Sequence, residues 1–201
     1  MQPSCIVRTT TDHIADPLTE RDLIDLCKKS DKGGQKLLYE TYIKQLTRVC
    51  IRYVRDHDDA KDVLSDAFIK IFQNIGGFKH MMEGGLEAWL RKIVINQSLI
   101  FLRKRKLLKL HDLGEHHHLV SPDLADIDLD AKDLYASILE LPVGYRTIFN
   151  LFAVEGYSHK EIAEKLGITE SASRSQMTRA RSNLQAIVKK LTNKNRGNTG
   201  L

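Results

Sequence analysis

The sequence predicts an all-α protein: two small helical domains joined by a flexible acidic linker, the C-terminal one a helix-turn-helix. Three observations predict this class. Apolar residues recur every three or four positions over most of the chain, which is the period of an amphipathic helix. Alternation of apolar and polar residues, the signal of a strand, forms no convincing run. A stretch dominated by Asp and Glu divides the chain past its middle.

These changes in apolar periodicity and charge divide the chain into five expected segments. Residues 1–18 are expected to be a polar, flexible leader, and residues 19–108 an N-terminal helical domain. The acidic residues 109–132 are expected to form the linker. Residues 133–191 are predicted to be the helix-turn-helix domain, and residues 192–201 a flexible tail.

Four helices are expected in the N-terminal domain, each with apolar side chains along one face. Their ends are set by caps and by glycines. The first begins after Thr19 as N-cap and is broken by Gly33 and Gly34. The others are expected to reach about residue 55, to cover 60–74, and to run from 86 to about 108.

Residues 141–184 have the pattern of two short helices followed by a helix-turn-helix. Ser158 and Glu161 have the S-x-x-E spacing of a capping box, which starts the first helix of the motif. Gly167 suits the left-handed conformation at its end. Thr169 is the expected N-cap of the second helix.

The outer side of that second helix is suited to duplex DNA. Arg pairs with guanine, while Ser and Thr can contact bases or phosphates. The alternative is a helical hairpin with a solvated basic face, but the cap, the glycine and the basic face together favour DNA binding. In such motifs the N-terminal part of the second helix enters the major groove. The candidate residues are Ser171, Arg174, Ser175 and Thr178 near bases, and Arg179 and Arg181 near phosphates.

The helix at 86–108 carries a second candidate surface. An aromatic beside cations, preceded by a glycine-bounded loop, is similar to surfaces on which single-stranded bases stack. Two alternatives stay open: the Trp can be an ordinary core residue, and a basic run at a helix C-terminus favours the helix dipole without any ligand. The candidate residues are Trp89, Lys92, Asn96, Arg103 and Lys104.

Composition argues against several other classes. The chain has 31 Lys and Arg against 26 Asp and Glu, a net charge of +5, which favours polyanionic partners. No apolar run is long enough to cross a membrane, and the N-terminus lacks the apolar core of a signal peptide. Cys5, Cys27 and Cys50 have no paired spacing and are interpreted as reduced thiols. We therefore expect a cytoplasmic protein.

Nothing in the sequence points to an active site or a cofactor. The adjacent histidines at 116–118 lack the spacing of a metal site and are interpreted as linker. No motif for a catalytic nucleophile, a phosphate loop or a dinucleotide is found. An enzyme acting on nucleic acid would need a carboxylate or Cys/His cluster with metal spacing, so we predict no enzyme, no metal and no cofactor.

Four stretches together resemble the extracytoplasmic-function group of the sigma-70 family of bacterial RNA polymerase factors. Residues 59–68 are similar to the helix of that family that docks on the polymerase clamp. Residues 89–105 resemble the helix that recognises and melts the −10 element. Residues 141–146 and 155–181 resemble the opening and the helix-turn-helix of the −35 domain.

The resemblance implies a sigma initiation factor that binds core RNA polymerase and promoter DNA, as −35 duplex and −10 single strand. It implies that a −10 base is captured by the loop at 77–85. An anti-sigma factor is a common partner in this group, although no residue demonstrates one. The alternative is a stand-alone helix-turn-helix transcriptional regulator. The resemblance assigns polymerase binding to Asp59, Asp62, Asp66, Phe68 and Lys70, a face that could otherwise be simple solvated surface.

Two segments depart from the pattern of the family. The recognition helix opens with Ser171-Ala172-Ser173-Arg174 in place of a Gly-Thr-Val-Lys-like sequence. Ser173 therefore stands where an apolar β-branched side chain usually packs. The loop GGFKHMMEGG at residues 76–85 lacks the usual Arg- and Ser-rich composition.

Overall fold

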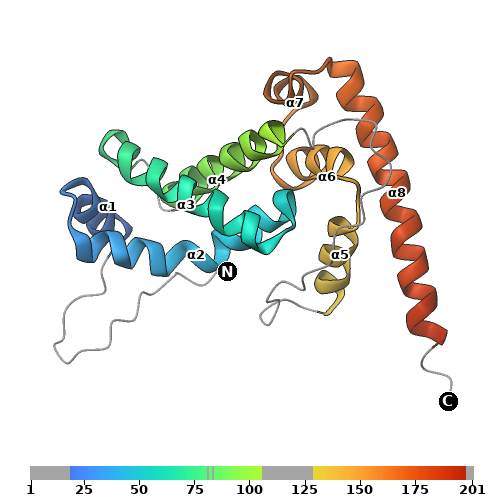
Figure 1. The fold of residues 1–201 in the computed structure, drawn as a ribbon, viewed down its shortest axis with the longest axis horizontal. Coiled ribbons are helices and arrows are strands. Elements are labelled where there is room, and N and C mark those ends of the chain that lie inside the picture. The colour runs from blue at the N-terminus through green and yellow to red at the C-terminus, as the bar shows by residue number, and fades with distance from the viewer. Residues whose placement is uncertain (1–18, 81, 83, 106–128, 198–201) are drawn as a thin grey trace. The chain divides into compact units, whose positions relative to one another are not determined.

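The computed structural model describes residues 19–80, 82, 84–105 and 129–197 (Figure 1). Among these residues the regular elements are all helical, which confirms the predicted all-α class. The chain divides into two compact units. Unit 1 comprises Met1–Val49 and Lys61–Gln97, and unit 2 comprises Cys50–Ala60 and Ser98–Leu201. The predicted leader, the histidines at 116–118 and most of the predicted linker lie outside the described residues.

Unit 1 is built from five elements, three of which continue into unit 2. Its buried apolar residues include Leu23 and Ile24, Leu38 and Leu46, Ile71, and Leu90. They come from every α-helix of the unit, at the helical spacing that the sequence predicted. The elements are α1 (Glu20–Lys28), α2 (Lys32–Val54), α3 (His57–Asn74), η1 (Ile75–Gly77) and α4 (Gly85–Lys104).

Helix α1 begins after Thr19 as N-cap, as predicted, and Thr19 and Asp22 also form a capping box. The Thr19 hydroxyl accepts a hydrogen bond from the Asp22 backbone N–H at 3.2 Å, and the Asp22 carboxylate accepts from the Thr19 N–H at 3.0 Å. These bonds satisfy two donors that the first turn of a helix leaves free.

The predicted break at Gly33 and Gly34 is wrong. Helix α2 begins at Lys32, so both glycines lie in its first turn, and the chain reverses at Ser30, whose φ is 58°. A Cβ atom on Gly34 would lie 2.5 Å from the Cβ of Leu26. This glycine is needed because α1 and α2 approach each other closely, and it does not end a helix.

Unit 2 contains the C-terminal helices. The long helix α8 packs against α5, α6 and α7, and Ile138, Leu141 and Leu184 form a core among them. Helix α5 begins inside the segment predicted as linker, and α8 continues into the predicted tail. The elements are α5 (Leu129–Leu139), α6 (Val143–Phe149), the π-helix η2 (Asn150–Val154), α7 (His159–Leu166) and α8 (Glu170–Gly197).

A buried cation, Arg146, organises the backbone of unit 2. Its guanidinium donates to four carbonyl oxygens at 2.9–3.2 Å: those of Leu139, Leu141, Arg52 and Tyr53. Three of these carbonyls lie in the last turns of α2 and α5, where intrahelical partners run out, and that of Leu141 lies in the connection between α5 and α6. Burial lowers the pKa of Arg146 to about 9, with Arg55 as a second cause, so the side chain is still charged at neutral pH.

Candidate nucleic-acid and polymerase interfaces

The helix-turn-helix is fixed by the three local signals expected from the sequence. The Ser158 hydroxyl accepts from the Glu161 N–H at 3.3 Å, and the Glu161 carboxylate accepts from the Ser158 N–H at 2.8 Å. Gly167 ends α7 in the left-handed region with φ 69°. The Thr169 hydroxyl accepts from the Ala172 N–H at 3.1 Å and caps α8. All three predictions are confirmed.

The outer side of α8 presents hydroxyls and guanidinium groups to solvent. Arg174 forms an ion pair with Glu170 one turn earlier. The hydroxyls of Ser175 and Thr178 donate to carbonyls of their own helix, at 3.0 and 3.2 Å. These local contacts are exposed, so DNA can replace them at little cost. All six candidates are exposed: Ser171, Arg174, Ser175, Thr178, Arg179 and Arg181.

Ser173, which departs from the family pattern, is fully buried, with 0% of its surface exposed. Its hydroxyl lies 2.9 Å from Nδ1 of His159, the first residue of α7. A hydrogen bond between the two helices of the motif therefore occupies the slot where an apolar side chain usually packs. Sequence reasoning missed His159, although a buried Ser requires a polar partner.

His159 is also part of a short aromatic stack. Its ring lies parallel to that of Phe152 with centroids 4.4 Å apart, and the guanidinium carbon of Arg181 lies 5.8 Å from the centre of the Phe152 ring. Desolvation lowers the pKa of His159, and the charge of Arg174 lowers it further. The ring is thus neutral at pH 7 and can donate to or accept from Ser173.

The candidates on α4 differ in exposure. Trp89 is half-buried and packs on Phe78, with ring centroids 5.0 Å apart, so it serves partly as core. Arg103 donates from Nε to the Leu99 carbonyl at 3.3 Å. The polar candidates of this helix are all exposed: Lys92, Asn96, Arg103 and Lys104.

The candidate docking residues fall into three environments. Asp62, Asp66 and Lys70 are exposed on α3. Asp59, in unit 2, forms a two-pronged ion pair with Arg105, whose Nη2 lies 2.9 Å from the nearer carboxylate oxygen. Phe68 is only 5% exposed, so its ring packs in the core of unit 1, and its assignment to polymerase binding stays a prediction.

Two apolar residues near Phe68 are exposed instead. Tyr39 packs on the Phe68 ring at 4.7 Å between centroids and keeps 45% of its surface exposed. Ile69 is 55% exposed. The sequence prediction of the docking face named neither residue. Exposed apolar groups beside charges are a common property of interfaces.

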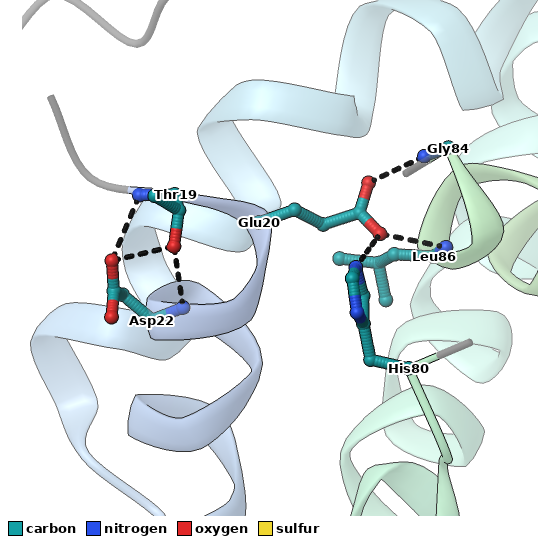
Figure 2. A network of polar contacts seen from close by, with 6 residues as sticks. All are labelled: Thr19, Glu20, Asp22, His80, Gly84 and Leu86. Atoms are coloured by element: carbon teal, nitrogen blue, oxygen red, sulfur yellow. Dashed lines mark hydrogen bonds and ion pairs between the residues drawn. The ribbon is translucent and has the colours of Figure 1, made fainter. Parts of the chain in front are cut away.

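Glu20 connects α1 to the loop before α4, as Figure 2 shows. Its carboxylate accepts from the backbone N–H groups of Gly84 at 3.1 Å and Leu86 at 3.2 Å. Nε2 of His80 lies 3.1 Å from the same carboxylate, which makes an ion pair when the ring is protonated. Local sequence patterns do not predict this role for Glu20, since its partners are sixty or more residues away.

Two thiols of the described residues are structural. Cys27 and Cys50 are buried, and desolvation raises the pKa of the first to about 11 and of the second to about 12. They remain protonated at neutral pH and act as small core residues. Cys5 lies outside the described residues.

The residues that the structure describes contain no cluster of His, Cys, Asp and Glu side chains arranged to hold a metal ion. No helix in them is both long enough and apolar enough to cross a membrane.

Comparison with known families identifies the fold. The profile described as "Sigma-70 region 2" matches residues 38–107, and the profile "Sigma-70, region 4" matches residues 131–184. The sigma factor RpoE of Bartonella quintana, solved in complex with the anti-sigma factor NepR, superimposes with a TM-score of 0.51 at 24% identity. The match covers 77% of this chain and 96% of that one, and it shows a shared fold.

Individual relatives place the chain within a group. The ECF RNA polymerase sigma-E factor of Haemophilus influenzae is 27% identical over 191 residues, 89% of this chain and 100% of that protein. The ECF RNA polymerase sigma factor SigM of Mycobacterium tuberculosis is 29% identical over 170 residues, 85% of each chain. The chain belongs to the sigma-70 family, in its extracytoplasmic-function group.

Proposed function

We propose that this sigma factor binds core RNA polymerase and directs it to promoters by reading −35 duplex with α8 and capturing −10 single strand with α4 and the preceding loop. The observation that carries the proposal is the row of exposed Ser, Thr and Arg side chains on the first turns of α8. They lie on a helix whose start is fixed by a cap at Thr169 and by the part-buried bond between His159 and Ser173. Rigid placement of this kind is what base readout requires.

The proposed −10 surface is supported by α4. Lys92 and Asn96 are exposed four residues apart, and Trp89, which packs on Phe78, is only partly buried. Cations follow a single-stranded backbone, while aromatic rings stack on bases. A base held outside the stack costs a few kcal/mol, which such contacts offset. In this proposal residues 19–108 bind polymerase and −10 DNA, and residues 133–191 bind −35 DNA. An anti-sigma factor is a further proposed partner, because such partners are common in the extracytoplasmic-function group.

The proposed polymerase-docking face lies on α3. Asp62, Asp66 and Lys70 are exposed there, next to the exposed apolar side chains of Ile69 and Tyr39. This combination of apolar area with charge at its rim fits a protein partner with a complementary basic rim. Phe68 supports the face from the core.

The decisive experiment adds the purified full-length protein to core RNA polymerase with a library of promoter fragments. We expect a stoichiometric complex, transcripts that start at a restricted set of sites, and shared −35 and −10 sequences among them. A protein that forms no complex with core enzyme, yet binds duplex DNA specifically by itself, would instead be the stand-alone regulator.

A charge-reversal pair tests the docking face. Asp62→Arg with Asp66→Arg should weaken binding to core enzyme by about ten- to a hundredfold, since like charges brought together at an interface cost a few kcal/mol. Binding to isolated −35 duplex should be unchanged. The control is Asp25→Arg with Glu40→Arg, which makes the same change in net charge at two other exposed acids. Equal weakening by both pairs would remove the specific role of this face.

A further inference from the structure

The loop between η1 and α4 is held at its far end by a carboxylate from another helix. The two N–H groups bound by Glu20, those of Gly84 and Leu86, belong to the start of α4. Donors at this place have no intrahelical acceptor. The Gly85 N–H is bound separately by the Met82 carbonyl at 3.1 Å. Glu20 therefore acts as a helix cap supplied from α1 (Figure 2).

The chemistry of this cap is favourable in several ways. A carboxylate accepts stronger hydrogen bonds from N–H groups than a neutral side chain does. Its negative charge lies at the positive end of the α4 dipole. Gly84 has a φ of 75°, a conformation that glycine adopts readily. In this conformation its N–H donates to the Glu20 carboxylate. Only 17% of the Glu20 side chain is exposed, so water competes weakly for its part-buried bond to the Leu86 N–H.

Other contacts fix the rest of the described loop. Phe78 packs on Trp89, α1 packs against η1, and His80 lies against Glu20. Lys79 and Met82 are exposed, Met82 by 69% of its surface, while Met81 and Glu83 lie outside the described residues. In the described part of the loop, the anchored Phe78 and His80 thus flank the exposed Lys79.

We infer that Glu20 is a positioning residue for −10 recognition: it sets the register of this loop against Trp89 and thereby the loop's choice among single-stranded bases. The inference rests on the proposed role of the loop and α4 in −10 binding. Glu20 itself touches no DNA in this scheme. It acts through the amides of Gly84 and Leu86 and through the ring of His80.

The test compares Glu20→Gln with Asp25→Asn. Both variants remove one negative charge from α1, but Asp25 is exposed and lies outside the network. The first measurement is hydrogen exchange of the Gly84 and Leu86 amides in the full-length protein. We expect Glu20→Gln to raise their exchange rates about fivefold, the size expected for the loss of one helix cap, and Asp25→Asn to leave them unchanged.

The second measurement uses holoenzyme reconstituted with each variant. The probes are single-stranded oligonucleotides carrying the non-template −10 strand of a promoter selected by the wild-type holoenzyme, each with one base changed. Glu20→Gln should reduce the preference for the selected base about fivefold. Affinity for core enzyme and for −35 duplex should stay at the wild-type value. His80→Gln, which keeps both backbone bonds, should have a smaller effect in the same direction.

The outcomes separate this inference from the proposed function. Wild-type holoenzyme without any −10 base preference overturns the proposed function, and the inference falls with it. A wild-type preference that Glu20→Gln keeps unchanged overturns the inference alone, as do unchanged amide exchange rates. A loss of core and −35 binding along with −10 preference would assign Glu20 a general role in folding and would also overturn it.

Discussion

The two candidate DNA-reading regions are held in place in different ways. In the helix-turn-helix, the pairs that fix the geometry are close in sequence: Ser158 with Glu161, Thr169 with Ala172, and His159 with Ser173. In the loop before α4, the cap comes from Glu20, more than sixty residues away. The first region is assembled by local signals and one adjacent helix. The second depends on a separate helix being folded against it, so a change far from the loop can alter what it binds.

The largest expected effect comes from removing the buried Arg146 guanidinium, which hydrogen-bonds four carbonyl groups in unit 2. Arg146→Met should lower the free energy of unfolding by about 3–5 kcal/mol, because buried carbonyl groups lose their donor. Thermal and denaturant unfolding measure this directly, with Arg103→Met as a control at an exposed arginine. A loss no larger than that of the control would mean that water replaces the guanidinium without cost.

A smaller effect is expected on DNA binding from the local region itself. Arg174→Ala should weaken binding to a selected −35 duplex by about 1–3 kcal/mol if the side chain contacts a base, and should relax the sequence preference at one position. Fluorescence anisotropy with single-base variants of the duplex measures both. Lys190→Ala, an exposed cation farther along α8, is the control and should keep the preference. Unchanged preference with Arg174→Ala would make Arg174 a solvated residue.

The contrast between the two regions also explains what the sequence could predict. The capping box at Ser158, the left-handed Gly167 and the cap at Thr169 depend on residues within a few positions, so spacing alone identified them. Exposure of the polar face of α8 followed from helical period. The fold class followed from the same period along the rest of the chain.

What the sequence could not predict depends on contacts between distant segments. Gly34 looked like a helix breaker, but its function is set by Leu26 on the neighbouring helix. The family resemblance assigned Phe68 to a docking face, but its ring is buried and Tyr39 packs on it from α2. Glu20 looked like an ordinary first-turn acid. In each case the deciding partner lies on another helix or turn, and periodicity carries no information about it.

The bond between Ser173 and His159 is intermediate between these cases, because its partners are fourteen residues apart on adjoining helices. Ser173→Ala should lower the free energy of unfolding by about 0.5–1.5 kcal/mol, the usual contribution of one such bond. The loss should nearly disappear in a His159→Phe background, where the partner is already absent. A double-mutant cycle measures this coupling. Equal losses in both backgrounds would show that Ser173 contributes through packing alone.

The smallest expected effect is a pH dependence from the same ring. Burial and Arg174 lower the pKa of His159 below its ordinary value of 6.5, so the unfolded chain takes up this proton at a higher pH than the folded chain. The unfolded state then binds more protons, and stability rises with pH through this window. The free energy of unfolding should therefore fall as pH drops through 6.5 and level off below the lowered pKa. His159→Phe should flatten that part of the profile, while the other histidines contribute equally to both proteins. Identical slopes in denaturant unfolding across this range would show that His159 titrates normally, and that the bond to Ser173 tolerates a charged ring.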